Sequence, residues 1–234
     1  MRTTLFSVLF LAVAFCSAQN INQFDANGKR HGKWQKNFKD SNALRYKGQF
    51  EHGKEVGTFT YYQKIGKVSK IAATKEFNPN NNIAIVTFLS LQGKIVSQGK
   101  MDGKKYIDKW TYYHKNSNVL MTTEFYNANG NLEGKKVVYY DNGNKAEETN
   151  YVDGKLDGDA NYYSESGALV KTYKYRKGDL HGETKHYNED GTIAIEGQYQ
   201  NNHKHGWWKY YRNGEVYEEK DFTRYSKNPK KKKN

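Results

Sequence analysis

The sequence predicts an all-β protein, an elongated single-layer antiparallel sheet built from tandem β-hairpins. One set of glycines recurs every 24 residues: Gly134, Gly158, Gly182 and Gly206. A second set follows at nearly the same interval: Gly143, Gly167, Gly191 and Gly214. Aromatic residues make up 15% of the chain and there are only 2 prolines, which favours strands. Two marker sets with one period indicate a repeated supersecondary unit.

One unit is predicted to contain two strands and two turns. Residues 178–182 begin and end with glycine and suit a tight connection. Residues 183–187 form a short first strand, an Asp-Gly signal within residues 188–191 closes a hairpin, and residues 192–199 return as the second strand. A single hairpin is marginally stable, so the units must stack on their neighbours. With two strands per unit at about 4.8 Å each, an array of about eight units would be a ribbon about 75 Å long.

The N-terminal half follows the same plan less strictly. Glycine pairs precede aromatic residues in two units: Gly28 and Gly32 before Trp34, and Gly53 and Gly57 before Phe59. Before Trp110 the second glycine is replaced by Asp108, and about two periods separate Gly57 from Asp108. A degenerate unit is therefore expected around residues 67–99. It contains an Asn-rich turn, residues 77–82, and the most apolar stretch after the first 20 residues, residues 83–91.

The first 18 residues have the pattern of a secretory signal peptide. Arg2 precedes an apolar run, residues 5–15, which is too short to span a bilayer as a helix, and small residues follow it. We predict residues 1–18 as the signal peptide, residues 19–225 as the repeats and residues 226–234 as a basic disordered tail. The protein is then exported to the periplasm, the envelope or the extracellular space. Lipidation of Cys16, the only cysteine, is disfavoured because Phe15 occupies a position that requires a small residue.

The formal net charge of +13 is concentrated partly at the C-terminus. The last fifteen positions contain Lys220, Arg224, Lys227, Lys230, Lys231, Lys232 and Lys233. Such a segment is either a solvated terminus or attracted to anionic surfaces, and for an exported chain lipid is a more available partner than nucleic acid. Lys230 to Lys233 are the predicted lipid contacts.

Residues 46–57, YKGQFEHGKEVG, resemble the MORN repeat, with its spacing of aromatic, any, Gly, any, aromatic, two any, Gly, three any, Gly. Looser copies at residues 126–134 and 139–143 are similar to the bacterial MORN-variant proteins known as YwqK-type antitoxin components. The resemblance implies tandem hairpins, with roles in lipid association, protein scaffolding or immunity. Asn202 and Asp108 depart from the pattern, each replacing a glycine.

No catalytic constellation is apparent in the sequence. The chain has no Gly-x-Ser-x-Gly elbow and no His-Glu-x-x-His pair, and the glycine-lysine pattern of residues 48–55 has Glu55 where a phosphate-binding loop needs Ser or Thr. His31, His181 and His205 occupy equivalent turn positions. Units lie about 10 Å apart, which is too far for two such side chains to share an ion. We expect no enzyme activity, cofactor or metal.

Aromatic residues are the expected binding and packing elements. Successive side chains on a strand point to opposite faces of the sheet, so Trp207 and Trp208 are expected to lie on opposite faces. Tyr140, Tyr163, Tyr187 and Tyr211 are predicted to stack as a ladder. Exposed aromatic residues interleaved with lysines would suit a protein partner or an acidic ligand. The predicted partner contacts are Trp34, Trp110, Trp207, Trp208 and Lys209.

The sequence thus predicts an exported, non-enzymatic binding protein, either an interaction scaffold or an antitoxin-like or immunity-like module. The alternative is association with anionic membrane or envelope glycolipid through the basic tail and the repeat surface. Gly53, Gly57, Gly134, Gly158, Gly182 and Gly206 are predicted to shape the turns.

Overall fold

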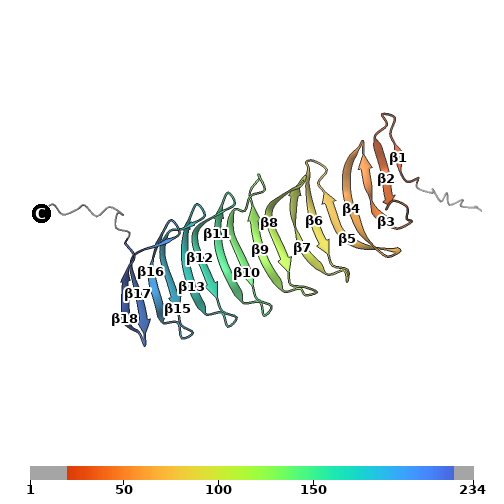
Figure 1. Cartoon of the computed structure of the whole chain (residues 1–234). Helices are drawn as coiled ribbons and strands as arrows, with labels where there is room; N and C mark the ends of the chain where they lie inside the picture. Colours follow the sequence, from red (N-terminus) through yellow and green to blue (C-terminus); the bar gives the residue numbers. More distant parts are fainter. Residues whose placement is uncertain (1–19, 224–234) are drawn as a thin grey trace, which may run out of the picture.

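The computed structural model describes residues 20–223, which form 18 β-strands in one open antiparallel sheet (Figure 1). The N-terminal strands are β1 (Gln23–Phe24), β2 (Arg30–Asn37), β3 (Leu44–Glu51), β4 (Lys54–Ile65), β5 (Val68–Phe77), β6 (Ile83–Leu89), β7 (Ile95–Asp102), β8 (Lys105–Tyr113) and β9 (Leu120–Tyr126). The C-terminal strands are β10 (Gly134–Tyr139), β11 (Lys145–Val152), β12 (Lys155–Tyr163), β13 (Leu169–Arg176), β14 (Asp179–Leu180), β15 (Gly182–Tyr187), β16 (Ile193–Gln200), β17 (His203–Arg212) and β18 (Glu215–Asp221). The predicted all-β fold class is confirmed.

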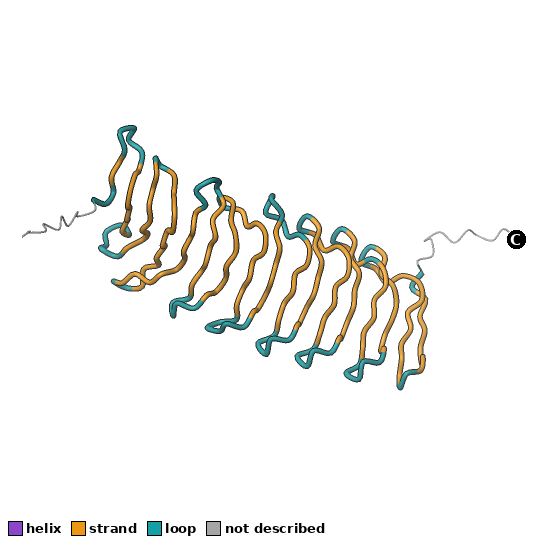
Figure 2. Tube along the Cα trace, turned by 180° about the vertical axis from the view of Figure 1, so that it is seen from behind, coloured by secondary structure: helices purple, strands orange, loops and turns teal. Residues whose placement is uncertain are grey.

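Each strand pairs with its neighbours in sequence, so β1 and β18 lie at opposite ends of the ribbon (Figure 1). The short β14 and the longer β15 both pair with β13 and together occupy one strand position. The turns follow the two long edges of the ribbon (Figure 2). We call the edge with the β11–β12 turn the Gly154 edge and the edge with the β10–β11 turn the Gly143 edge. Within residues 20–223, no helix is long and apolar enough to cross a membrane.

The turns of the Gly154 edge join each unit to the one before it. In the β11–β12 turn, Asp153 and Gly154 both have positive φ, 46° and 79°, as a two-residue hairpin with the sheet's twist requires. The Gly154 N–H donates to the carbonyl of Leu132 at 2.8 Å. Asn202 takes the equivalent position with φ 66° and donates to Leu180 at 3.0 Å. The replacement of glycine by asparagine therefore leaves the connection intact.

The other glycines predicted to shape turns also have positive φ, as does the aspartate that replaces one of them. These are Gly53, Gly57, Gly134, Gly158, Gly182, Gly206 and Asp108. In four units the second glycine position lies not in the hairpin turn but in a bulge of the following strand, because β4, β8, β12 and β17 each contain extra residues relative to their partner. Gly134 and Gly182 are instead the first residues of β10 and β15. In β4, β8 and β17 the bulge directs an aromatic side chain across the partner strand.

A glycine and an aromatic ring pack together in three of these bulges. The rings of Phe59, Trp110 and Trp208 lie over Gly48, Gly99 and Gly197, where an added Cβ would be 2.3–2.4 Å from the ring. Each tryptophan ring N–H donates to a carbonyl of the strand that contains the glycine. Trp110 donates to the Lys100 carbonyl at 2.8 Å, and Trp208 donates to the Gln198 carbonyl at 3.1 Å. We call the face to which these three rings point the aromatic face.

Two units use other pairs on the same row of the aromatic face. Thr149 takes the place of the glycine and Ala160 takes the place of the aromatic residue. The two residues lie opposite each other, and both are fully buried. Farther along the row, Lys136 and Glu124 form an ion pair at 3.4 Å, and the Tyr126 hydroxyl donates to Glu124 at 2.6 Å. The pairs that fill this row therefore differ in chemistry from unit to unit.

Two residues of the predicted degenerate unit, residues 67–99, belong to the hydrophobic core cluster. Ala84 and Val86 of β6 pack with Met101 and Trp110. The Asn-rich turn before β6 is held by its own side chains, because Asn78 and Asn81 accept backbone N–H bonds two residues ahead. Its shape is explained by local hydrogen bonds.

The tyrosine ladder is not formed by ring stacking. The Tyr140 hydroxyl instead donates to the Tyr163 carbonyl at 2.8 Å, which ties two neighbouring units together along the Gly143 edge. Among the described residues, Tyr140, Tyr163, Tyr187 and Tyr211 make no ring contacts with one another. The prediction of stacked rungs was wrong because these residues lie at strand ends, where a hydroxyl reaches the adjacent turn more easily than a ring reaches a ring.

Candidate partner-binding face

The face opposite the aromatic one carries the side chains that alternate with the buried rings, and we call it the polar face. Trp207 precedes the buried Trp208 on β17 and therefore points to the polar face. Its side chain is 60% exposed, the largest exposure of any tryptophan in residues 20–223. An exposed tryptophan on a strand is the kind of residue that anchors protein interfaces.

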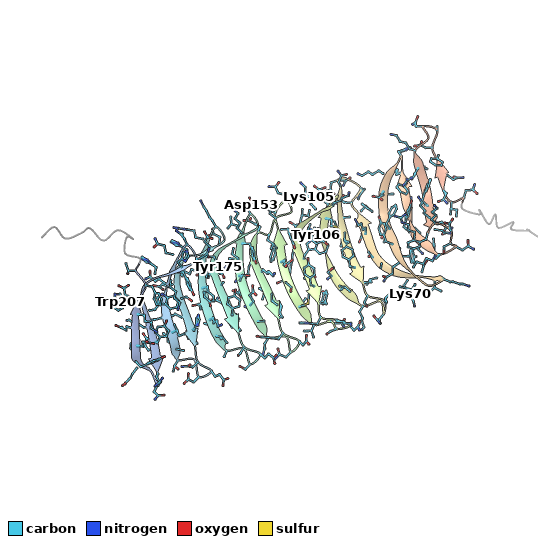
Figure 3. All side chains as sticks on the ribbon, in the orientation of Figure 1. Lys70, Lys105, Tyr106, Asp153, Tyr175 and Trp207 are labelled. Atoms are coloured by element: carbon cyan, nitrogen blue, oxygen red, sulfur yellow. The ribbon has the colours of Figure 1, made fainter. Side chains whose placement is uncertain are left out.

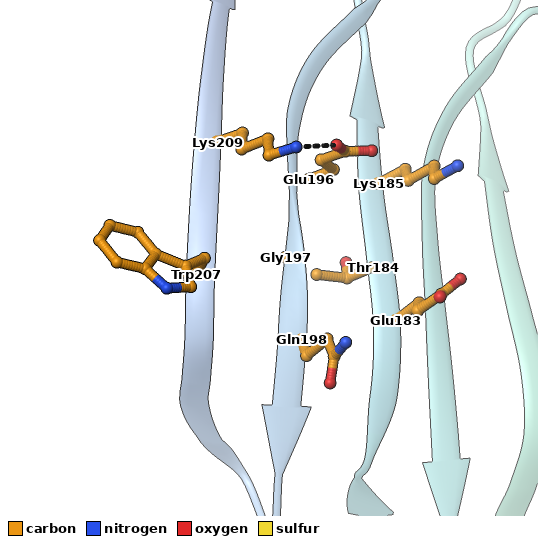
Figure 4. Close-up of a pocket in the computed structure, with 8 residues that line it drawn as sticks. All are labelled: Glu183, Thr184, Lys185, Glu196, Gly197, Gln198, Trp207 and Lys209. Atoms are coloured by element: carbon orange, nitrogen blue, oxygen red, sulfur yellow. Dashed lines mark ion pairs between the residues drawn. The ribbon is translucent and has the colours of Figure 1, made fainter. Parts of the chain in front are cut away.

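Trp207 borders a shallow open hollow of about 200 Å³ across β15, β16 and β17 (Figure 4). The other side chains that line it are polar or charged: Glu183, Lys185, Glu196, Gln198 and Lys209. Neighbouring strands pair Lys185 with Glu196 and Glu196 with Lys209, so charges alternate across the sheet. The hollow therefore offers hydrogen-bond donors and acceptors of both signs next to one apolar anchor.

The charges in this hollow are partly fixed by internal contacts. Lys209 Nζ lies 3.9 Å from Glu196 Oε1, and the Tyr211 hydroxyl donates to the same oxygen at 2.7 Å. The hydrogen bond to Glu196 raises the pKa of Tyr211 above its ordinary value. By contrast, Glu183 and Lys185 form no ion pair with any described residue. These two are free to pair with charges of a partner.

A second hollow of about 300 Å³ continues the first toward β12 and β13. Glu183 and Lys185 line both hollows, and Asn161 and an ion pair between Lys174 and Asp159, 3.5 Å apart, extend the surface. The polar face from β12 to β17 is thus a continuous shallow surface of mixed charge that ends at Trp207.

The predicted partner contacts divide between this face and the core. Trp207 and Lys209 lie on the polar face, but Trp110 and Trp208 are 0% and 1% exposed and cannot contact a partner with their side chains. Trp34 is half-buried: its ring N–H donates to the Gln23 carbonyl at 3.0 Å and its ring meets Phe24 edge to face. We correct the prediction for Trp110 and Trp208 to packing roles, because the bulges lay their rings over the partner strand. The contact predicted for Trp34 stays a prediction, since this residue is only half-buried.

Sequence reasoning did not single out Glu183, Lys185 and Gln198, which line the hollow. Their alternation along β15 and β16 would have placed them on the face of Trp207 once the strand boundaries were known. Lys230, Lys231, Lys232 and Lys233 lie outside the described residues, as does the predicted signal peptide. Residues 20–223 contain no group of three His, Cys, Asp or Glu side chains that could hold a metal ion.

The comparisons with known proteins concern the repeat. A family model described as the MORN repeat variant matches residues 132–153 and residues 180–201. These segments contain most of the β10–β11 and β15–β16 hairpins and begin 48 residues apart, which is two periods. A comparison with curated proteins finds no match. Together with the 18-stranded sheet of stacked hairpins, the two matched segments support the presence of MORN-variant repeats in this chain.

Proposed function

We propose that this protein is an exported, non-enzymatic binding module that contacts a protein partner through the polar face of β12–β17. The exposed Trp207 beside the unpaired Glu183 and Lys185 supports this proposal. A large aromatic anchor surrounded by polar groups is the composition of a protein interface, whereas the open, shallow hollow does not enclose a small molecule. MORN repeats generally serve as protein-binding or membrane-binding modules.

An antitoxin-like or immunity-like role would be one form of this binding. If residues 1–18 direct export, the protein meets a toxin only outside the cytoplasm, so the toxin would be located in the envelope or delivered from another cell. Two observations support this proposal: the signal-like pattern of residues 1–18 and the exposed Trp207 on a surface of mixed charge.

The proposal is tested by binding measurements with single-residue variants. A partner is captured from the envelope fraction, purified and titrated calorimetrically against the parent protein and Trp207→Ala. Loss of a tryptophan anchor costs about 2 kcal/mol or more, which weakens binding at least thirtyfold. Val152→Ala is the matched control, because Val152 is similarly exposed but lies at the Gly154 edge. Equal affinity of Trp207→Ala and the parent would refute the assignment of this face.

A further inference from the structure

The two ends of the ribbon differ in how their last strands are covered. At the N-terminal end, β1 lies along β2, and the Asn22 N–H donates to the Lys33 carbonyl at 2.9 Å. The Asn22 side chain also accepts from the Gln35 N–H at 2.9 Å. At the C-terminal end, β18 pairs with β17 and has no second partner strand within residues 20–223 (Figure 1). Trp207 marks this end of the ribbon in Figure 3. The outer edge of β18 is therefore open.

Backbone groups of alternate residues on β18 point away from β17. The Phe222 N–H, one residue past the strand, donates to the Gly206 carbonyl at 2.9 Å. Neighbouring residues of an antiparallel strand direct their N–H and C=O groups to opposite sides. The backbone groups of Lys220 therefore also face β17, and those of Glu219 face outward. Glu219 thus presents a backbone donor and acceptor in the arrangement that an added strand requires.

A row of alternating charges crosses the polar face and ends at this edge. From β15 to β18 the directly paired residues of the row are Lys185, Glu196, Lys209 and Glu219. Lys209 forms its ion pair with Glu196, whereas Glu219 forms none with a described residue. Opposite charges on directly paired residues stabilise a sheet, and like charges destabilise it. The next position of the row, on a strand added to β18, therefore favours a cationic side chain.

The strand β18 is acidic as a whole. Its charged residues are four carboxylates and one lysine: Glu215, Glu218, Glu219, Asp221 and Lys220. Lys220 Nζ lies 2.9 Å from Glu218 Oε1, so the lysine is already paired. Charged side chains on an edge strand commonly prevent pairing with copies of the same strand. Those of β18 repel a second β18 in this way, but they attract a strand that carries lysine or arginine.

The position that receives an aromatic ring inside the array is occupied at β18. In β16, Gly197 leaves space for the Trp208 ring of the next strand. Lys220 takes the equivalent position of β18, because it lies opposite Trp208 as Gly197 lies opposite Thr184. The Lys220 ammonium lies over the Tyr210 ring at 5.4 Å from its centroid, on the face where a further ring would pack. The edge therefore favours a strand of different origin over another unit of this array.

We propose that the open edge of β18 binds an extended, lysine-bearing or arginine-bearing segment of a partner protein as an added strand. Main-chain hydrogen bonds to β18 hold the segment, and a cationic side chain beside Glu219 continues the alternating row. Val216 and Tyr217, which are 43% and 53% exposed, supply apolar contact. This site goes beyond the contact surface around Trp207, because it uses backbone groups in the plane of the sheet rather than side chains on its face.

The probe is a fluorescently labelled peptide of alternating lysine and valine, as long as β18 and with blocked ends. It is titrated by fluorescence anisotropy against a chain that begins at Gln19 and keeps every described residue, and saturable binding is expected. A peptide with glutamate in place of every lysine should not bind. A peptide of unchanged charge with proline in place of its central valine cannot form a regular strand. This second control is expected to bind at least about tenfold more weakly, because main-chain hydrogen bonds are lost.

Two substitutions at one position separate the backbone contribution from the charge. Glu219→Gln removes the charge and is expected to weaken peptide binding up to about fivefold, the effect of one opposite-charge pair. Glu219→Pro also removes the outward N–H and is expected to weaken binding by about a further fivefold. Proline is tolerated on an edge strand where its nitrogen faces solvent. Glu165→Gln removes an exposed carboxylate from the β12–β13 turn and is expected to bind like the parent.

Hydrogen exchange of the parent chain separates strand addition from simple charge attraction. The lysine-valine peptide is expected to slow exchange of the outward amides in residues 215–221, because hydrogen bonding protects an amide from exchange. Exchange in β15, three strands away, is expected to stay unchanged. Charge attraction without backbone pairing would leave exchange in both segments as it is in the free chain.

The outcomes distinguish this site from other occupants and from the polar face. Absence of peptide binding, equal binding of the proline-containing peptide, or unchanged affinity of both Glu219 variants would each overturn the proposal. Peptide binding that appears only after removal of residues 226–234 would assign the edge to the protein's own tail. Concentration-dependent association of the chain alone, lost in Glu219→Pro, would assign it to a second copy. Lys185→Gln, in the hollow of the polar face, should leave peptide binding unchanged, so the two surfaces are tested separately.

Discussion

Substitution of Gly99 by alanine tests the packing of the aromatic face most sharply. A Gly→Ala change in a strand ordinarily raises the free energy of unfolding, but here we expect it to lower that free energy. Glycine within a strand costs about 0.5–1 kcal/mol relative to alanine, so Gly→Ala normally stabilises a strand. At Gly99, however, an added Cβ would be 2.4 Å from the Trp110 ring. An ordinary contact is at least about 3.4 Å, so the ring must move by about 1 Å.

Trp110 has little freedom to make this movement. It is fully buried, its ring stacks on Tyr106 with 3.9 Å between the centroids, and its N–H donates to the Lys100 carbonyl at 2.8 Å. Overpacking costs about 1–3 kcal/mol, and a weakened hydrogen bond costs about 1 kcal/mol more. Gly99→Ala is therefore expected to destabilise the protein by about 2–4 kcal/mol.

The assay is urea unfolding followed by circular dichroism, with hydrogen exchange of β7 and β8 as a local readout. The local readout is needed because a repeat array need not unfold in one step. In a Trp110→Ala background the clash is absent, so Gly99→Ala should be neutral or stabilising by about 0.5 kcal/mol. A neutral effect of Gly99→Ala in the parent would refute the account of glycine-ring packing.

Three further predictions follow from the same structure. Trp208→Ala should destabilise the protein by about 3–5 kcal/mol in urea unfolding, whereas Trp207→Ala should change its stability by less than about 0.5 kcal/mol, and similar losses would contradict the assigned faces. Gly154→Ala should lower stability by about 1–2 kcal/mol, because alanine must adopt φ 79° there, and an unchanged melting temperature would argue against this turn. Burial raises the pKa of Tyr61 and of Tyr112 to about 12. Their contribution to stability is fully present below pH 10 and is lost as the pH rises toward 12, so ultraviolet titration should show tyrosines ionising two pH units late, and ionisation of all tyrosines near pH 10 would contradict their burial.

The repeat period and the turns could be predicted from sequence because they depend on local backbone geometry. Glycines at fixed spacing mark positive φ, and asparagine or aspartate substitutes for them, as at Asn202 and Asp108. The hairpin order then follows because consecutive antiparallel strands need only short connections.

The division of tryptophans between core and surface could not be predicted with the same certainty. Alternation alone shows that Trp207 and Trp208 point to opposite faces, but it does not show which face is buried. The buried face is decided by the bulge, which lays Trp208 over Gly197, and that contact joins residues eleven positions apart.

Photo-crosslinking in the host organism tests the central claim, that the polar face binds a protein partner while the aromatic face serves for packing. Benzoylphenylalanine is placed at Trp207 on the polar face or at Tyr162 on the aromatic face, and adducts are resolved by electrophoresis after irradiation. The account predicts a discrete adduct from position 207 and none from position 162. An adduct from position 162 alone, or from neither position, would contradict it.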